Sequence, residues 1–327
     1  MLAKTAFLAF ALAGAQQAGI AQESPPVEAR TVQQGDEARD DTAPDDTDAI
    51  TVTGQLEQRK AILGYIDAVI SETPGDQYAR FTDPVCPSAI GFSKENNALI
   101  EKRIRQVAKH AGVEVADAEC SPNIHLLIVD DGKSALRTLR RRYRAAFGQM
   151  PLWQRDRLQR NEGPVYAWHT TDTISNEDGT SRSRLGAGVP VPGGGNSVIG
   201  SEAVNAARTS TKSLIGVPVR QELRHAFVII EQDAVAGMTT VQLADYALMR
   251  GLIQTDPEGP KKANIESVLE LFDPELRSDD RPLSVRDWDV ALLTALYKAP
   301  VNVRSARQRS AMRQFFTDYL NTDDGGK

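Results

Sequence analysis

The chain has 327 residues, a formal net charge of -6, 41% hydrophobic residues and two cysteines. This composition is typical of a globular protein and excludes collagen-like, coiled-coil and fully disordered classes. Two cysteines are too few for a disulfide-rich scaffold or for a zinc site made of cysteines alone. No apolar run beyond residue 25 approaches the length of about 18 residues that a membrane helix needs, so we expect no transmembrane segment in the mature chain.

Residues 1–21 have the pattern of a secretory signal peptide. Lys4 supplies a short positive region, residues 5–14 are mostly apolar, and small side chains at positions 19 and 21 suit a signal peptidase. We predict cleavage after Ala21, with residues 13–15 as the second choice, and a periplasmic or secreted location. A buried N-terminal helix is the alternative.

The acidity of the chain belongs to one segment. Residues 22–50 hold nine acidic and two basic residues and no aromatic one, whereas residues 51–327 hold 35 acidic and 35 basic residues. Such a segment cannot bury enough apolar surface to offset chain entropy, so residues 22–49 are predicted to be a disordered acidic leader. Residues 50–327 would then form the folded region, with possible subdivisions near residues 150 and 260.

The leader ends in a β-prone strip, Asp48-Ala49-Ile50-Thr51-Val52-Thr53-Gly54. This strip resembles the TonB box of TonB-dependent receptors, although the rest of the chain is too short and too helical for such a receptor. A strip of this kind could add as a strand to a partner's sheet. It could equally be the first strand of the folded region.

The first part of the folded region predicts alternating helices and strands. Apolar side chains recur at helical spacing over residues 55–71, and Pro74-Gly75 ends that helix. A strand, a helix, a strand and a helix are then expected at residues 85–92, 93–111, 124–129 and 133–147. The long crossover between the two strands is typical of a parallel pair, so a small βαβα unit is predicted here.

The middle of the chain is mixed, and its last third is helical. We expect in turn a short helix at 151–160, a strand at 165–174, a Gly/Pro-rich loop at 185–198, a strand at 226–231 and a helix capped by Thr239 or Thr240. Three helices follow. The first covers 264–272, the second is opened by a capping-box-like Ser284-x-x-Asp287, and the third covers 304–320. The predicted fold class is therefore α+β, with a βαβα unit, a mixed central part and a helical C-terminal third.

Cys86 and Cys120 are predicted to form a disulfide. An exported protein with two cysteines usually joins them. In a parallel β-α-β unit both would lie at the same end of neighbouring strands, where a Cα separation of about 6 Å is plausible. Two buried free thiols are the alternative, and no C-x-x-C motif suggests a catalytic cysteine.

The histidines and glycine-rich stretches form no recognised catalytic motif. No HExxH occurs, and a straight strand would place His225 roughly 20 Å from Glu231, too far to share a metal ion. Residues 186–191 lack the third glycine of GxGxxG, and residues 188–194 lack the lysine of a P-loop. We predict no metal site and no cofactor.

The densest basic region contains eight arginines. Arg137, Arg141 and Arg144 are expected to share one solvent face of the helix at 133–147, which makes them candidates for binding an anion. The other arginines of the region are Arg140, Arg142, Arg155, Arg157 and Arg160. A solvated surface, docking of the acidic leader or a partner, and nucleic-acid binding are the alternatives. Export and the few interleaved aromatic residues argue against nucleic acid.

Three stretches carry a resemblance to a known family: RFTDPVCPSAIGF, CSPNIHLLIVDD and AFVIIEQDAVAGMTTVQLADYALMRGL. They resemble a family of exported proteins of sphingomonad-type alphaproteobacteria to which no activity is assigned. The resemblance spans most of residues 79–273. It implies export and no particular catalytic residue.

The last of these stretches also has the local order of a zincin core, a strand followed by a helix. Where a zinc protease would carry HExxH, this helix offers Gln242, Asp245 and Tyr246. The likeness concerns fold alone. Weak catalytic candidates are Glu231, Asp233, Asp245 and Tyr246, which flank this strand-helix junction.

These observations favour a non-catalytic exported protein that binds an unknown envelope protein or ligand. The alternative is a hydrolase of zincin-like topology that lacks the standard HExxH site. A deep pocket lined by two of the candidate carboxyl groups would favour the hydrolase, and a filled junction would favour the binding protein.

Overall fold

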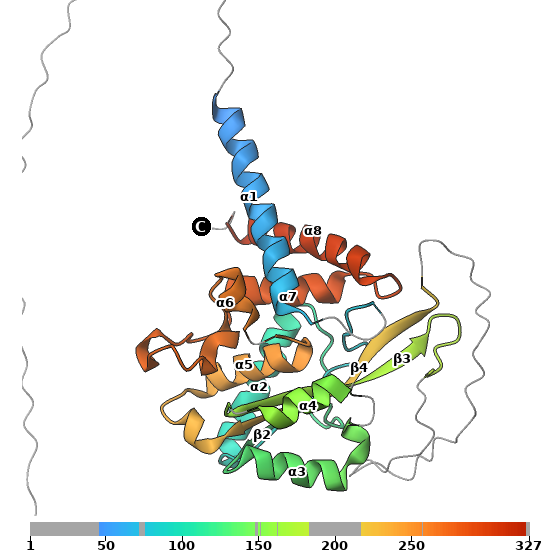
Figure 1. The fold of residues 1–327 in the computed structure, drawn as a ribbon, viewed down its shortest axis with the longest axis vertical. Helices are drawn as coiled ribbons and strands as arrows, with labels where there is room; N and C mark the ends of the chain where they lie inside the picture. The colour runs from blue at the N-terminus through green and yellow to red at the C-terminus, as the bar shows by residue number, and fades with distance from the viewer. Residues whose placement is uncertain are drawn as a thin grey trace, which may run out of the picture. The chain divides into compact units, whose positions relative to one another are not determined.

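The computed structural model describes residues 46–71, 76–147, 150, 152–161, 163–182, 217–256 and 258–324 (Figure 1). The signal peptide predicted at 1–21, the leader up to residue 45 and the loop predicted at 185–198 lie outside these residues. The elements are α1 (Asp46–Val69), β1 (Pro87–Ile90), α2 (Lys94–His110), β2 (Ile124–Val129), α3 (Gly132–Arg142), η1 (Arg144–Phe147), α4 (Leu152–Arg160), β3 (Val165–Ser175), β4 (Val219–Glu231), η2 (Gln232–Val235), α5 (Thr240–Leu252), α6 (Gly259–Ala263), η3 (Val268–Phe272), η4 (Ser278–Asp280), α7 (Asp287–Lys298) and α8 (Ser305–Asp324), where η denotes a 3₁₀ helix.

Four strands form one mixed sheet in the order β1-β2-β4-β3. β1, β2 and β4 are parallel, and β3 is antiparallel to β4. The helix α2 connects β1 to β2, as the predicted β-α-β unit requires. The predicted α+β fold class is therefore confirmed, including the helical C-terminal third.

The side chains of β2 and β4 alternate between two cores. Ile124, Leu126 and Ile128 of β2 are buried in the main core, together with the residues opposite them on β4. Leu127 and Val129 face the other side of the sheet and pack on a smaller core. Because side chains alternate along a strand, one sheet supplies both cores.

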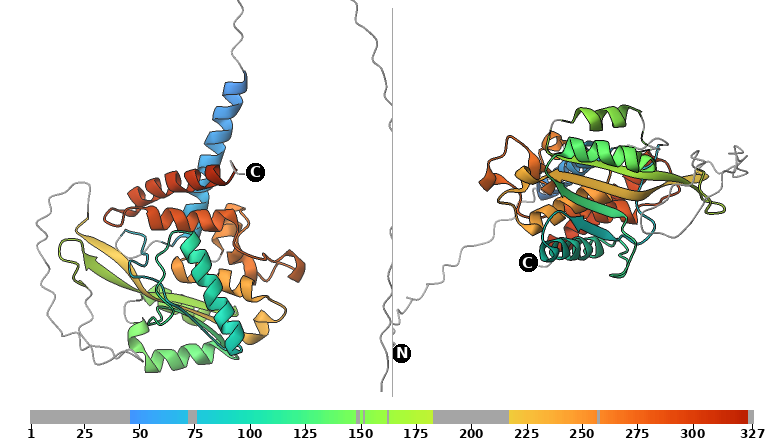
Figure 2. Two further views of the ribbon diagram at one scale, coloured as in Figure 1. Left: turned by 180° about the vertical axis from the view of Figure 1, so that it is seen from behind. Right: turned by 90° about the horizontal axis from the view of Figure 1, so that it is seen from below.

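Helices cover the two faces of the sheet unequally (Figure 2, right). The main core gathers side chains of α1, α2, α5, α7 and α8, from Ile62 to Phe316. The smaller core lies under α3, η1 and α4, and its buried members are Leu136, Phe147, Met150, Leu158, Tyr166, Trp168 and Ile229. The helix α5 is buried around its whole circumference, as expected of a helix at the centre of a core.

Cys86 and Cys120 form the predicted disulfide, with Cα atoms 6.0 Å apart. Cys86 directly precedes β1, and Cys120 lies shortly before β2, so both stand at the same end of two parallel neighbours. The Asn123 side chain accepts a hydrogen bond from the Cys86 backbone N–H at 2.7 Å and donates to the Pro84 carbonyl at 3.1 Å. The bridge therefore joins segments that hydrogen bonds already hold together.

The interpretation of residues 48–54 as a strand is wrong, because they lie within α1. Later turns of this helix bury Ile62, Tyr65, Ile66 and Val69 completely. Once those turns are packed, each further residue extends an existing helix, whereas a strand would need a partner to pair with. The limit of the predicted leader at residue 49 accordingly falls inside α1, which begins at Asp46.

The expected helix over residues 133–147 is interrupted. α3 ends at Arg142, Tyr143 adopts φ -125° and ψ 61°, and a 3₁₀ turn follows. The turn brings Phe147 onto Trp168, with ring centroids 4.9 Å apart. Burial of this aromatic side chain takes precedence over continuation of the arginine-rich helix.

Two further predictions in the C-terminal third are wrong. No single helix covers 264–272: Asn264 ends α6 in the left-handed conformation (φ 54°), and Ser267 caps η3 in a capping box with Glu270. At the start of α7, Asp289 Oδ2 accepts a hydrogen bond from the Arg286 backbone N–H at 2.9 Å, and the N-cap is Arg286 and not Ser284. The Asp289 carboxylate is fully buried, a fact that the local pattern does not reveal.

Candidate anion-binding site

The helix α3 is amphipathic, and its basic side points away from the sheet. Asp131 caps the helix by accepting a hydrogen bond from the Ser134 N–H at 2.9 Å. Leu136 is buried in the smaller core, with Leu139 packed against that core. Residues three and four apart share a helix face, so Arg137, Arg140 and Arg141 lie together on the side of α3 away from the core. All three are exposed.

The 3₁₀ turn η1 and the helix α4 are linked by hydrogen bonds. The Trp168 Nε1–H donates to the Ala146 carbonyl at 3.0 Å, which holds the turn against β3. The Arg155 Nη2 donates to the carbonyls of Phe147 and Met150 at 3.3 and 3.2 Å. These contacts place an arginine of α4 beside the arginines of α3.

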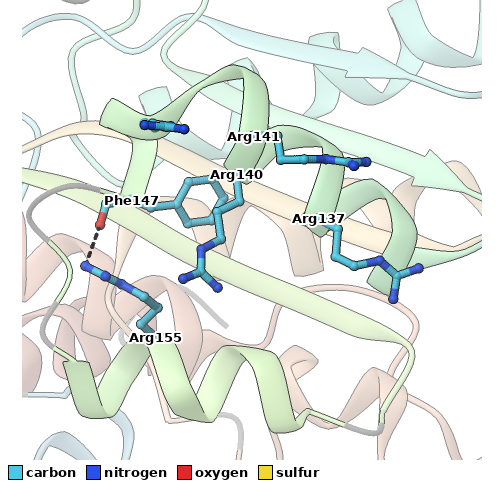
Figure 3. Close-up of a pocket in the computed structure, with 6 residues that line it drawn as sticks. Arg137, Arg140, Arg141, Phe147 and Arg155 are labelled. Carbon is cyan, nitrogen blue, oxygen red and sulfur yellow. Dashed lines mark hydrogen bonds between the residues drawn. The ribbon is translucent and has the colours of Figure 1, made fainter.

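The result is a pocket of about 580 Å³, which we call the arginine pocket. Figure 3 shows Arg137, Arg140 and Arg141 on α3, Arg155 on α4, and the Phe147 ring between the two helices. The lining residues are Arg137, Arg140, Arg141, Arg144, Phe147 and Arg155. Three elements that follow one another in the chain thus contribute five arginine side chains to the lining of one cavity.

No carboxylate of the described residues forms an ion pair with any of these five guanidinium groups. Five like charges in one cavity raise the local positive potential, which salt screens over a Debye length of about 8 Å at physiological ionic strength. A bound anion would relieve this repulsion, and guanidinium groups match carboxylates and phosphates in a two-pronged geometry.

The structure places the predicted anion-binding residues Arg137, Arg141 and Arg144 in this one pocket. Arg140 and Arg155 join them, although the expected helical face did not include either. Arg157 and Arg160 are not among its described lining residues, and they pair with Asp256 at 3.3 Å and Asp156 at 3.8 Å. The abundance of arginine over 137–160 was the available signal, but only the bend at Tyr143 brings α4 next to α3.

Two of the four weak catalytic candidates are buried in the main core. Asp245 has no exposed surface. Its carboxylate accepts hydrogen bonds from Arg103 Nε at 2.7 Å and Nη2 at 2.8 Å, and from the Val285 N–H at 3.0 Å. Tyr246 packs edge-on against Phe272, and burial raises the pKa of its hydroxyl. The contacts of Asp245 and Tyr246 are therefore those of residues that stabilise the core.

The other two candidates lie at the end of β4. Glu231 Oε1 accepts hydrogen bonds from the Gly132 N–H at 3.1 Å and the Tyr166 hydroxyl at 3.4 Å, which ties α3 to the sheet. A Cβ atom at Gly132 would lie 2.2 Å from the Tyr166 ring, so this close approach requires glycine. Asp233 lies in η2. None of the four candidates lines the arginine pocket.

Two histidines on neighbouring strands contact each other, a pairing that the sequence analysis did not predict. His125 Nε2 of β2 lies 3.3 Å from His225 Nδ1 of β4, and the rings stack. Burial, together with the smaller effect of the nearby His225, lowers the pKa of His125 to about 4. A stack continues through Phe227 and Trp168 to Phe147 at the arginine pocket. Within the described part of the chain, no three or more His, Cys, Asp or Glu residues are grouped so as to hold a metal ion.

His169 of β3 is a buried histidine whose pKa makes stability depend on pH. Its Nε2 lies 2.9 Å from the Gly251 carbonyl, and burial lowers its pKa from 6.5 to about 4. Between these values the unfolded chain binds a proton that the folded protein does not, so stability falls as the pH is lowered from 6.5 to 4. We expect His169→Gln to remove roughly 3 kcal/mol of this fall, measured by urea unfolding at several pH values. An unchanged pH profile would contradict the assignment.

Among the described residues, no helix is both long and apolar enough to span a membrane. Comparisons of the chain with protein-family models, with curated proteins and with solved structures found no match.

Proposed function

We propose that this is an exported, non-catalytic protein that binds an anionic component of the cell envelope through the arginine pocket. One observation carries the proposal: five arginines from α3, η1 and α4 line a cavity of about 580 Å³, and none forms an ion pair with a described carboxylate. The ligand would carry at least two phosphate or carboxylate groups, because one anionic group cannot contact five guanidinium groups at once.

The composition of the pocket supports binding over catalysis. Its lining consists of arginines and a phenylalanine that is 4% exposed. Arginine stays protonated in proteins and cannot serve as a general base, and none of the described residues that line the pocket has a nucleophilic side chain. The zincin-like hydrolase is less well supported, because its candidates Asp245 and Tyr246 are buried among partners of their own.

Export rests on the sequence of residues 1–21, and the disulfide is consistent with it. A bridge between Cys86 and Cys120 persists in oxidising compartments such as the periplasm and is rare in the cytosol. An exported binding protein meets anionic groups on lipids, on cell-envelope polymers and on acidic segments of other proteins. The pocket would take any of these through the same charge-assisted hydrogen bonds.

Inorganic tripolyphosphate is a suitable probe, because it carries several anionic groups and no other recognition feature. We expect the purified protein to bind it in calorimetric titrations, with affinity that falls as salt rises. Replacing both Arg141 and Arg144 by glutamine should weaken binding by at least about tenfold, because charge-assisted hydrogen bonds are lost.

The matched control is the double variant Arg142→Gln with Arg160→Gln. Both residues are exposed, they lie on α3 and α4, and neither is among the described residues that line the pocket. The control removes the same total charge, so it should weaken binding by less than about twofold. Equal losses in the two double variants would show a diffuse surface charge effect and overturn the proposal, as would the lack of any binding at low salt.

A further inference from the structure

A second pocket, of about 150 Å³, lies between α4, β3 and the C-terminal end of α5. We call it the inner pocket. Its lining includes Trp168 and the polar residues Arg157, His169, Arg250 and Gln254, and none of its described lining residues also lines the arginine pocket. At about 30 Å³ for each water molecule, the volume is that of about five waters.

Arg250 brings a buried positive charge to the inner pocket. The residue is 9% exposed, and no described carboxylate forms an ion pair with it. Its Nη1 donates to the carbonyl and the hydroxyl of Thr255 at 3.3 and 3.0 Å. Its Nε is buried and has no hydrogen-bond partner among the described residues. A buried charge without a counter-ion is costly, so this group favours an anion.

Gln254 adds an acceptor to the same pocket. Its Oε1 is buried and likewise lacks a partner in the described part of the chain. An amide oxygen only accepts hydrogen bonds, so an occupant that satisfies it must carry an N–H or O–H group. A ligand that complements the inner pocket would therefore carry a negative group next to Arg250 and a hydrogen-bond donor next to Gln254.

The remaining polar side chains do not neutralise Arg250. His169 Nε2 is engaged with the Gly251 carbonyl at 2.9 Å. Burial keeps the pKa of His169 near 4, so its ring is neutral at pH 7 and only Nδ1 is left as an acceptor. Arg157 is paired with Asp256 at 3.3 Å and is 59% exposed on its side chain, which leaves Arg250 as the cation that lacks a counter-charge.

We propose that the inner pocket binds a small carboxylate that bears a hydroxyl or ammonium group next to it. The carboxylate accepts hydrogen bonds from Arg250, and the hydroxyl or ammonium group donates to Gln254 Oε1. A volume of about 150 Å³ admits only a few heavy atoms, since pockets for drug-sized molecules measure about 300–1,000 Å³. This site is independent of the arginine pocket.

The experiment compares three small molecules on the purified full-length protein at constant ionic strength. Lactate has both groups, propionate has the carboxylate alone, and lactamide has the hydroxyl without the charge. Lactate should raise the melting temperature by roughly 3 °C at about ten times its Kd, because it binds the native state only. Propionate should bind less tightly, and lactamide should cause no shift.

Two variants of Gln254 test the roles assigned to the pocket. Gln254→Glu supplies Arg250 with a carboxylate of its own, so the ligand-free protein should keep or gain stability while the lactate shift is lost. Gln254→Ala removes the acceptor and leaves Arg250 in place, so lactate and propionate should then bind equally. The variant with Arg141→Gln and Arg144→Gln should keep the lactate shift, because those residues line the other pocket.

Each opposite result overturns the proposal. A shift that survives Gln254→Glu, or an equal shift with lactamide, would mean that lactate does not bind at Arg250. No shift by lactate up to about 10 mM would mean that the pocket takes no such ligand. Loss of the lactate shift in the arginine-pocket variant would show that lactate binds in the arginine pocket and would refute this site. If Gln254→Glu fails to fold, the comparison of lactate with lactamide and the Gln254→Ala variant decide.

Discussion

Replacing both Cys86 and Cys120 by alanine is expected to lower the free energy of unfolding by about 4 kcal/mol. The bridge spans a sequence separation of 34 residues, and in the chain-entropy model a loop of this length removes about that much freedom from the unfolded state. The native contacts near it should remain, because Asn123 and the β1-β2 ladder hold the same segments. The effect therefore lies mainly in the unfolded chain.

Urea unfolding of the oxidised protein, the reduced protein and the double variant measures this loss. The reduced protein and the variant should agree closely, since both lack the cross-link and keep the fold. Both thiols should resist alkylation until a reductant is added. Equal stability of the oxidised and reduced proteins, or two thiols that react under native conditions before any reductant is added, would contradict the prediction.

Asp289→Ala is expected to destabilise the protein by about 4 kcal/mol, because several buried donors would lose their acceptor. Asp289 has no exposed surface. Its Oδ1 accepts hydrogen bonds from the Tyr65 hydroxyl at 3.0 Å and the Ser267 hydroxyl at 2.5 Å. Its Oδ2 accepts from the backbone N–H groups of Val268 and Arg286, each at 2.9 Å. One carboxylate thus joins α1, η3 and α7.

Asp289→Asn is the sharper comparison. Its amide oxygen can still accept from the two backbone N–H groups, and its NH₂ can donate to the two hydroxyls, which rotate to accept. The loss should therefore be about 1–2 kcal/mol, close to that of Tyr65→Phe, which removes a single hydrogen bond. Chemical unfolding of the three variants gives these values. A loss for Asp289→Asn as large as that for Asp289→Ala would show that charge, and not acceptor geometry, stabilises this network.

Much of the α/β part of the fold could be read from local patterns. The apolar run at 124–129 predicted β2 with the bounds it has, and α5 is capped by Thr239, one of the two expected caps. The disulfide followed from two facts about a parallel unit, namely neighbouring strands and cysteines at one end of them. These features depend on nearby residues, so periodicity and capping residues are sufficient to indicate them.

The helix boundaries that failed were those set by distant contacts. The 3₁₀ turn at 144–147 exists because Phe147 packs on Trp168, which lies on another element. The cap of α7 depends on Asp289, whose carboxylate also serves Tyr65, more than 200 residues away in the chain. No local pattern carries such information, since propensity yields to tertiary packing at these sites.

The sequence by itself determined the arginine content of residues 137–160, the pair of cysteines, and the order of strands and helices that places them. Only the tertiary structure decided that five of those arginines share a cavity, that His125 meets His225, and that Arg250 is buried without a carboxylate partner among the described residues. The reason is physical: side-chain type and periodicity are local properties of a chain. Burial and the meeting of charges depend instead on which surfaces the folded chain brings together.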